Sequence, residues 1–346
     1  MTELKFDHGL RAQRVLFGAG QAAGNVAQAL ADLGVDKPML IASEREAELA
    51  TTVTAGVDVA THFDEVVMHV PAEVAERGRQ AAEGVDALIS VGGGSTTGLA
   101  KAIALTNGLP IIAVPTTYAG SEATAVWGMT ENRTKTTGID EKVLPRVVVY
   151  DPDLLATLPT DLAIASGLNA MAHCVDSLWA PKADPINRAH ALEGARLLRD
   201  GLRGIRTDET SQSRELTLAG CYLAALSFSS AGSGLHHKIC HVLGGTFDLP
   251  HAETHATVLP HVLRFNADAG GQAHVDRLAE VFGTADAAEG LRALYEAIDA
   301  PASLAAIGFT EGDIPEAVER ILAAAPPSNP VTVTEDNMTE LLRGAL

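Results

Sequence analysis

Over the first 154 residues, short apolar runs alternate with helix-like stretches, and no other feature of the chain constrains its fold as strongly. The helix-like stretches cover residues 21–33, 71–83 and 96–105. The apolar runs have the length and β-branched content of buried strands, and they read RVLFGAG, PMLIAS, EVVMHV, ALISVGG, PIIAVPTT and RVVVYDP. Strands that alternate with helices predict an α/β domain with a doubly wound, mainly parallel sheet.

The strand pattern stops after the segment YDPDLLATLP, and the rest of the chain has helical periodicity. Helices are predicted over residues 161–179, 185–202, 213–230, 235–243, 273–282 and 287–298, with a last amphipathic helix at MTELLRGAL. We therefore expect two domains, an α/β domain over residues 1–154 and an all-helical domain over residues 155–346.

The net charge limits the partners of this chain. Lys and Arg total 25 against 44 Asp and Glu, a formal charge of −19, which would repel the phosphate backbone of a nucleic acid. An anionic substrate would need cations supplied locally by its pocket. The 3 cysteines are an odd number without CxxC spacing, which favours a reduced, cytoplasmic setting. The long uncharged runs contain Pro, Gly and polar residues, so we expect buried core and no membrane span.

A glycine-rich turn joins a predicted strand to a predicted helix in ALISVGGGSTTGLAKAIAL. Glycines permit close backbone approach, and the N–H groups that open the next helix attract a pyrophosphate. Gly93, Gly94 and Ser95 are therefore candidate dinucleotide-binding residues. The motif is neither GxGxxG nor a P-loop, and a tight turn without a ligand is the alternative.

Polar residues follow two other predicted strands at the end where ligands bind in open α/β sheets. Glu44 ends one strand, where a carboxylate accepts hydrogen bonds from both ribose hydroxyls of NADH and repels the 2′-phosphate of NADPH. Thr116, Thr117 and Tyr118 end another. We expect these four residues to contact the cofactor.

Five of the 12 histidines lie in the stretch GLHHKICHVLGGTFDLPHAETHA. Pairs four residues apart share a helix face, and three such pairs occur: Asn169 with His173, His237 with His241, and His251 with His255. Converging imidazoles either bind a divalent cation or perform acid–base chemistry. Buried structural histidines are the third possibility.

Ordered motifs along almost the whole chain resemble the iron-containing alcohol dehydrogenase superfamily, whose fold is shared with dehydroquinate synthases. They are VLFGAG, VGGGSTTGLAKAIA, VPTTYAGSEAT, VVVYDP, SGLNAMAHCVD and GLHHKICHVLGGTFDLPHAETHA. The last one resembles the maleylacetate reductase branch. This resemblance implies a nucleotide-binding domain, a helical domain and an active site in a cleft between them. It also implies a homodimer that reduces 2-maleylacetate to 3-oxoadipate with NADH or NADPH.

The resemblance further assigns site residues position by position. Gly93, Gly94 and Ser95 match the pyrophosphate loop, Thr116 and Thr117 the cofactor lining, and Lys135 and Phe228 positions near the nicotinamide. The metal quartet of the alcohol dehydrogenases, one Asp and three His, falls on Asn169, His173, His241 and His251. Because a neutral amide replaces the anionic ligand, we expect no bound metal. The implied catalytic residues are then His173, His237, His241, His251 and Lys135, acting in acid–base and anion-binding roles.

The chemistry of an enone agrees with this interpretation. A simple ketone needs a Lewis acid for its developing alkoxide, whereas conjugate hydride addition to an enone gives an enolate that protonated side chains stabilise. A metal-dependent alcohol or diol dehydrogenase on the same fold remains the main alternative. A carbon–oxygen lyase of the dehydroquinate synthase type and a nucleotide sensor without activity are further alternatives.

Overall fold

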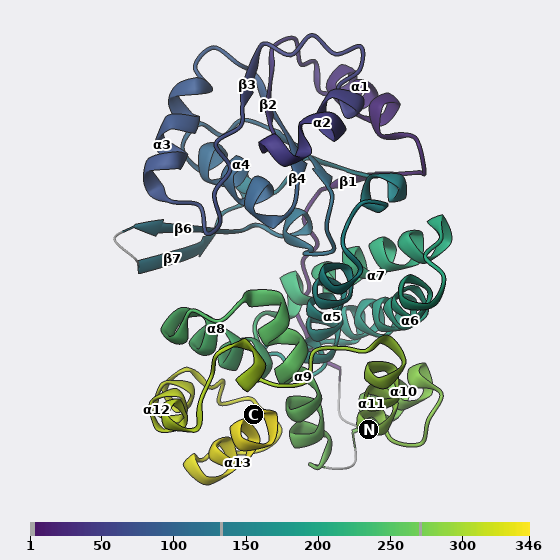
Figure 1. Ribbon diagram of the computed structural model, residues 1–346, viewed down its shortest axis with the longest axis vertical. Coiled ribbons are helices and arrows are strands. Elements are labelled where there is room, and N and C mark those ends of the chain that lie inside the picture. The colour runs from purple at the N-terminus through teal and green to yellow at the C-terminus, as the bar shows by residue number, and fades with distance from the viewer. Residues whose placement is uncertain (1–3, 132–133, 270–271) are drawn as a thin grey trace. The chain divides into compact units, whose positions relative to one another are not determined.

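The computed structural model describes residues 4–131, 134–269 and 272–346 (Figure 1). The chain forms two compact units. The first covers Arg11–Leu158, and the second covers Pro159–Leu346 together with the segment that ends at Leu10. The domain limits of 1–154 and 155–346 differ from these units by a few residues and by the assignment of the first segment.

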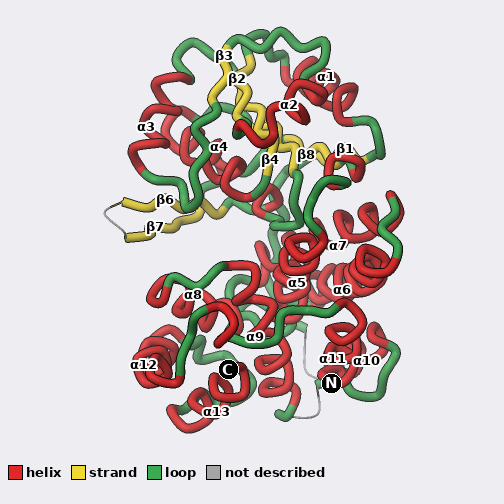
Figure 2. Tube along the Cα trace, in the orientation of Figure 1, coloured by secondary structure: helices red, strands yellow, loops and turns green. Residues whose placement is uncertain are grey.

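The first unit is built on a six-stranded sheet in the order β1-β8-β5-β4-β2-β3 (Figure 2). Every neighbouring pair in it is parallel. The strands are β1 Arg14–Phe17, β2 Pro38–Ile41, β3 Thr61–Phe63, β4 Ala87–Gly92, β5 Ile111–Pro115 and β8 Val147–Tyr150. The parallel sheet predicted from the sequence is confirmed. Strands β2, β4, β5 and β8 are buried along their whole length, as expected of strands covered on both faces.

Helices pack around this sheet as the predicted βαβ pattern requires. They are α1 Ala22–Leu33, α2 Ala47–Val53, α3 Ala72–Ala81 and α4 Gly94–Asn107. Helix α1 contacts β5 and β8 and α2 contacts β4, whereas α3 packs on α4, which contacts β4 and β5. The apolar core under α3 and α4 includes Met39, Ile41, Leu88 and Ile103.

Two local features of this unit differ from the sequence-based expectation. The run EVVMHV is not a strand; β3 precedes it. His69 and Val70 have φ values of 64° and 49°, which end extended backbone, and Met68 is 72% exposed. The hairpin of β6 Val126–Glu131 and β7 Thr134–Ile139 was not predicted, because its sequence lacks an apolar alternation.

The second unit is helical, as predicted. Its helices are α5 Thr160–Ser177, α6 Pro185–Thr207, α7 Ser211–Ala231, α8 Leu235–Phe247, α9 His251–Ala267, α10 Ala273–Phe282, α11 Ala287–Ile298, α12 Ile314–Ala324 and α13 Glu335–Ala345. Helix α5 is buried almost throughout from Ala163 to Ser177 and contacts α6, α7, α8 and α9. Helices α9 and α12 were not predicted as such. Within the described residues no single helix is long and apolar enough to cross a membrane; the bent pair α7 and α8 meets that test only jointly.

The N-terminal segment belongs to this helical unit. His8 Nδ1 lies 2.7 Å from Asp184 Oδ2. The other oxygen of Asp184 accepts hydrogen bonds from the backbone N–H groups of Ile186 and Asn187 and so caps α6. Side chains of His8 and Asp184 are 6% and 3% exposed. A buried imidazole–carboxylate pair therefore fastens the first residues to the start of α6.

Candidate active site

The glycine-rich turn has the geometry of a backbone cradle. Strand β4 ends at Gly92, whose φ of 151° suits glycine and where a Cβ would overlap the side chain of Thr96. Gly93 then caps α4 in an extended conformation. Gly93, Gly94 and Ser95 are all partly exposed. The first N–H groups of α4 have no partner within the helix and therefore favour an anion at this end.

The residues after β5 lie next to this turn, because β4 and β5 pair with Gly92 opposite Pro115. The Thr116 N–H donates a hydrogen bond to the carbonyl of Gly92 at 3.1 Å. A Cβ on Gly93 would come 3.0 Å from Cγ2 of Thr117. The structure thus brings Thr116 and Thr117 to the glycines. Tyr118 is 1% exposed, so it offers no surface to a cofactor in this conformation.

Glu44 opens a short 3-10 helix, Glu44–Glu46, three residues beyond the end of β2. Strand β2 pairs with β4, so Glu44 follows the strand next to the glycine turn. Both Glu44 and Arg45 are exposed, whereas the Glu46 carboxylate accepts a hydrogen bond from Ser43. The carboxylate of Glu44 is therefore accessible to a ribose, and its role remains a prediction.

Lys101 on α4 is a residue that sequence reasoning missed. Its ammonium is fully buried and donates to the carbonyls of Ser121, Thr124 and Val126 at 2.6, 2.8 and 2.9 Å. Burial lowers the pKa of Lys101 to about 7, although the Glu122 carboxyl nearby opposes this. The side chain fixes the loop that follows the hydroxyl residues of β5. A lysine within the apolar run LAKAIAL was the available signal.

Histidines from α5 and α8 meet a phenylalanine from α7 in the helical unit. The rings of His173 and His237 stack with centroids 4.9 Å apart and planes 10° apart. Phe228 contacts both, with centroids 4.7 Å from His173 and 4.2 Å from His237. His241 stands edge-on to His237 at 6.2 Å. The structure therefore brings His173, Phe228, His237 and His241 together, and their roles stay predictions.

Asp176 is a second residue that sequence reasoning did not assign. Its Oδ2 lies 2.7 Å from Nδ1 of His237. It also accepts hydrogen bonds from the N–H groups of Gly234 and His236, at 2.8 and 3.1 Å. One buried carboxyl group thus caps α8 and contacts an imidazole of that helix.

A further buried group lies beside this cluster. His236 Nε2 is 3.0 Å from His255 Nδ1 and 3.5 Å from Cys240 Sγ. His255 in turn contacts His251, with ring centroids 4.4 Å apart, and His237, at 4.9 Å. Helix α9 therefore connects its two histidines to the cluster. The pair His251 and His255 shares a face of this helix, as expected from their spacing.

Burial opposes protonation of these imidazoles and lowers their pKa values. Burial lowers the pKa of His173 well below its usual range, and the neighbouring His237 and His251 lower it further. The pKa of His237 is lowered in the same way, by burial and then by His241 and His251. Two stacked imidazolium rings without solvent would repel each other. A role for His173 or His237 in binding substrate carboxylates would therefore require protonation against this pKa shift, and it stays a prediction.

The remaining predicted residues are placed as follows. Asn169 lies one turn before His173 on α5 and is 4% exposed, and its Oδ1 has no hydrogen-bond partner within the described residues. His251 opens α9. Lys135 is in β7, but its side chain lies outside the part of the chain that the structure describes.

The predicted quartet does not fit a metal ion. Two ligands that each lie about 2.1 Å from zinc are at most about 4.2 Å apart. Among the described residues, the only His, Cys, Asp or Glu group of three or more whose donor atoms all lie within 4.8 Å is His236, Cys240 and His255. His173, His241 and His251 therefore do not converge on one ion, and Asn169 supplies no negative charge to hold one. Within the other trio, two imidazole nitrogens already hydrogen-bond directly.

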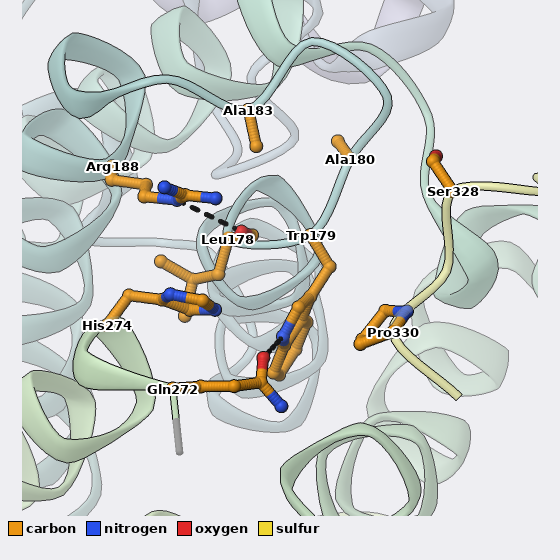
Figure 3. Close-up of a pocket in the computed structure, with 9 residues that line it drawn as sticks. All are labelled: Leu178, Trp179, Ala180, Ala183, Arg188, Gln272, His274, Ser328 and Pro330. Carbon is orange, nitrogen blue, oxygen red and sulfur yellow. Dashed lines mark hydrogen bonds between the residues drawn. The ribbon is translucent and has the colours of Figure 1, made fainter. Parts of the chain in front are cut away.

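A separate cavity of about 270 Å³ lies elsewhere in the helical unit. Figure 3 shows Arg188 donating to the carbonyl of Leu178, and Trp179 donating to Gln272. None of the predicted site residues lines it; its lining is Leu178, Trp179, Ala180, Ala183, Arg188, Gln272, His274, Ser328 and Pro330.

Comparison with known proteins agrees with this architecture. The model of the iron-containing alcohol dehydrogenase family matches residues 12–152, and the model of its C-terminal part matches residues 163–346. The chain is similar to a solved iron-containing alcohol dehydrogenase from Corynebacterium glutamicum, with 53% identity, a TM-score of 0.98, and coverage of 100% of this chain and 98% of the other. The chain therefore belongs to the iron-containing alcohol dehydrogenase family and is an oxidoreductase.

Within that family, its similarity to maleylacetate reductases extends over nearly the full length. The enzyme of Pseudomonas sp. (strain P51) is 42% identical, covering 99% of this chain and 98% of the relative. The solved maleylacetate reductase from Rhizobium sp. strain MTP-10005 is 38% identical with a TM-score of 0.94, covering 99% and 98%. These relatives place the chain in the maleylacetate reductase branch.

Proposed function

We propose that the protein reduces the carbon–carbon double bond of 2-maleylacetate to give 3-oxoadipate, using NADH in preference to NADPH. The proposal rests mainly on one observation: the chain is similar to maleylacetate reductases over nearly the full length of both proteins. A buried set of neutral imidazoles beside Asn169 supports it. Such a reaction belongs late in the bacterial breakdown of resorcinol- or chlorocatechol-type aromatic compounds.

The reaction balances without a further oxidant. Hydride leaves the nicotinamide of NADH, which becomes NAD⁺, and forms a C–H bond at the alkene carbon β to the ketone. The π electrons move to the ketone oxygen, giving an enolate. A proton from the protein then forms the second C–H bond, at the carbon next to the ketone. The enzyme must therefore bind two carboxylates, stabilise the enolate and supply one proton.

Each requirement has a candidate in this chain. The glycine turn with Ser95, together with Thr116 and Thr117, binds the pyrophosphate and cofactor, and Phe228 lies against the nicotinamide. Lys135, His241 and His251 hold the substrate carboxylates. His237 supplies the proton, since its Nε2 is buried and has no partner among the described residues. His173 stacks on His237 and keeps its ring in place.

An assay of the purified protein tests this function. We expect NADH absorbance to fall on addition of freshly prepared maleylacetate, with 3-oxoadipate as the product, at the same rate with and without EDTA. Absence of turnover with either NADH or NADPH would overturn the proposal. Loss of activity on chelation, restored by iron or zinc, would overturn its metal-free part alone.

The alternative function is a metal-dependent alcohol or diol dehydrogenase. It is favoured by the name of the Corynebacterium glutamicum relative and opposed by the neutral Asn169 and the separated histidine donors. Oxidation of short-chain alcohols or diols with NAD⁺, with and without added Fe²⁺ or Zn²⁺, distinguishes the two. We also propose a cytoplasmic homodimer, which size-exclusion chromatography with light scattering will test.

A further inference from the structure

The carboxyl group of Asp176 on α5 contacts both the start of α8 and a site histidine of that helix. It holds Gly234 and His236 through their N–H groups and His237 through Nδ1, with distances of 2.8, 3.1 and 2.7 Å. Both side chains of the Asp176–His237 pair are almost fully buried, with 1% and 3% exposed.

The sequence leaves room for this contact. A Cβ at Gly234 would overlap the carboxyl group of Asp176, so glycine at this position lets the start of α8 come close to α5. The opposite ring nitrogen, His237 Nε2, is buried and has no partner within the described residues. It is the nitrogen available to a substrate.

We propose that Asp176 is a positioning residue: it keeps a hydrogen on Nδ1 of His237, so that Nε2 is the nitrogen that exchanges a proton with the substrate. This inference rests on the proposed function of His237. Neutral imidazole carries one N–H, and the partner of one nitrogen decides the state of the other. A carboxylate at Nδ1 also stabilises the doubly protonated ring from which Nε2 donates.

In the proposed step the Nε2–H bond of His237 breaks and its proton forms the C–H bond next to the ketone. The electron pair of that bond stays on Nε2, and the Nδ1 hydrogen stays with the Asp176 contact. The enolate loses its negative charge. The doubly protonated ring becomes neutral and is reprotonated before the next turnover. The dianionic substrate favours the protonated ring electrostatically while it is bound.

Asp176→Asn tests this role, because the amide oxygen in the place of Oδ1 still accepts from the N–H of His236. Its NH₂, in the place of Oδ2, faces Nδ1 of His237, and the N–H of Gly234 loses its acceptor. We expect the hydrogen of the His237 ring to move from Nδ1 to Nε2, seen by ¹⁵N NMR of histidine-labelled protein and assigned with His237→Gln. We expect kcat to fall by at least about 10²-fold, with the NADH KM changed by only a few-fold. In the double variant with His237→Gln the loss should not add.

The chain supplies its own matched control. Asp184 is likewise buried, caps a helix and contacts an imidazole nitrogen of His8 at 2.7 Å. Its partners His8, Ile186 and Asn187 are not among the predicted site residues. Asp184→Asn should lower the melting temperature and leave kcat within a few-fold of wild type. If Asp176→Asn does not fold, Gly234→Ala replaces it, because the new methyl group displaces the carboxyl group without changing it.

Distinct results separate the possible failures. An unchanged His237 tautomer in Asp176→Asn, or a kcat within a few-fold of wild type, overturns the positioning role. A shifted tautomer with additive losses in the double variant also overturns it, since Asp176 would then act independently of His237. If the proposed function is wrong, the wild-type protein shows no turnover of maleylacetate. The tautomer of His237 is still measurable by NMR in that case, so the two failures are distinguishable.

Discussion

The imidazole of His173 lies parallel to that of His237, with 4.9 Å between ring centroids and 10° between ring planes. His173 and His237 are 8% and 2% exposed, and Phe228 contacts both rings. Further imidazoles lie beside His237. Protonating either ring places a cation in an apolar site beside groups that would repel a second one. The environment of these rings therefore favours neutral imidazole, and protonation of either ring lowers the stability of the folded state.

Acid should destabilise the protein through this cluster. Burial lowers the pKa of His236 to about 3 from 6.5, so an unfolded chain takes up its proton first as pH falls. This contribution to stability is complete above pH 6.5 and is lost progressively between pH 6.5 and about 3, by up to about 1.4 kcal/mol per pH unit. Urea unfolding of wild type and His236→Gln measures it. The variant should have the shallower decline, and equal slopes would contradict this.

His241→Ala should lower kcat more than it raises the NADH KM, because the residue lies with the cluster around His237 and not on the glycine turn. If His241 acts as an acid in the reaction, kcat falls by about 10²–10⁴-fold. Steady-state kinetics with maleylacetate decides this. A change of a few-fold would reduce His241 to a packing role.

Glu44→Ser should shift kcat/KM toward NADPH and leave the maleylacetate KM nearly unchanged. The exposed carboxylate follows β2 beside the glycine turn and would repel a 2′-phosphate. Arg45 is adjacent and is able to hold that phosphate, so wild type should prefer NADH without excluding NADPH. Parallel assays with both cofactors measure the ratio. A wild type that already favours NADPH would show that Glu44 does not contact the ribose.

Lys101→Met should alter the pH dependence of stability on the alkaline side. Burial lowers the pKa of Lys101 to about 7 from 10.5, so between these values the unfolded chain binds the proton more tightly. Wild-type stability should therefore gain up to about 1.4 kcal/mol per pH unit from this group as pH rises from 7 to 10.5. Denaturation of both proteins at several pH values isolates the difference. A constant difference would show that the ammonium remains charged throughout, held by its carbonyl partners.

Asn169→Asp should raise the affinity of the helical unit for Fe²⁺ or Zn²⁺, because it restores an anion at the orphaned amide oxygen. Equilibrium dialysis with metal analysis measures this directly. His236→Asp, a carboxylate placed in the neighbouring buried trio, serves as the positional control. If Asn169→Asp and His236→Asp bind the metal ion with equal affinity, the predicted quartet is not a preferred metal site.

The sequence predicted the sheet and most helices because their apolar periodicity is local. It failed at EVVMHV, where β-branched residues resemble a strand but His69 and Val70 have left-handed backbone. The glycine-rich turn between β4 and α4 was predictable because strand, glycines and helix are contiguous. Asp176 was missed because its partners on α8 are 58 to 61 residues away, although a carboxylate between buried Val175 and Ser177 was a signal. The neutrality of His173 and His237 depends on tertiary burial, which spacing alone does not reveal.

The contact between His8 and Asp184 has a consequence for biosynthesis. Residues 11–158 are contiguous, so a ribosome delivers everything the α/β unit needs before any of α5 is made. By contrast, His8 cannot contact Asp184 until some 170 further residues have been synthesised and the start of α6 has left the ribosome. Throughout that interval His8 lacks its buried partner Asp184. An N-terminal fusion tag should therefore perturb the last stage of folding, the closure of the helical unit, and leave the earlier stage untouched.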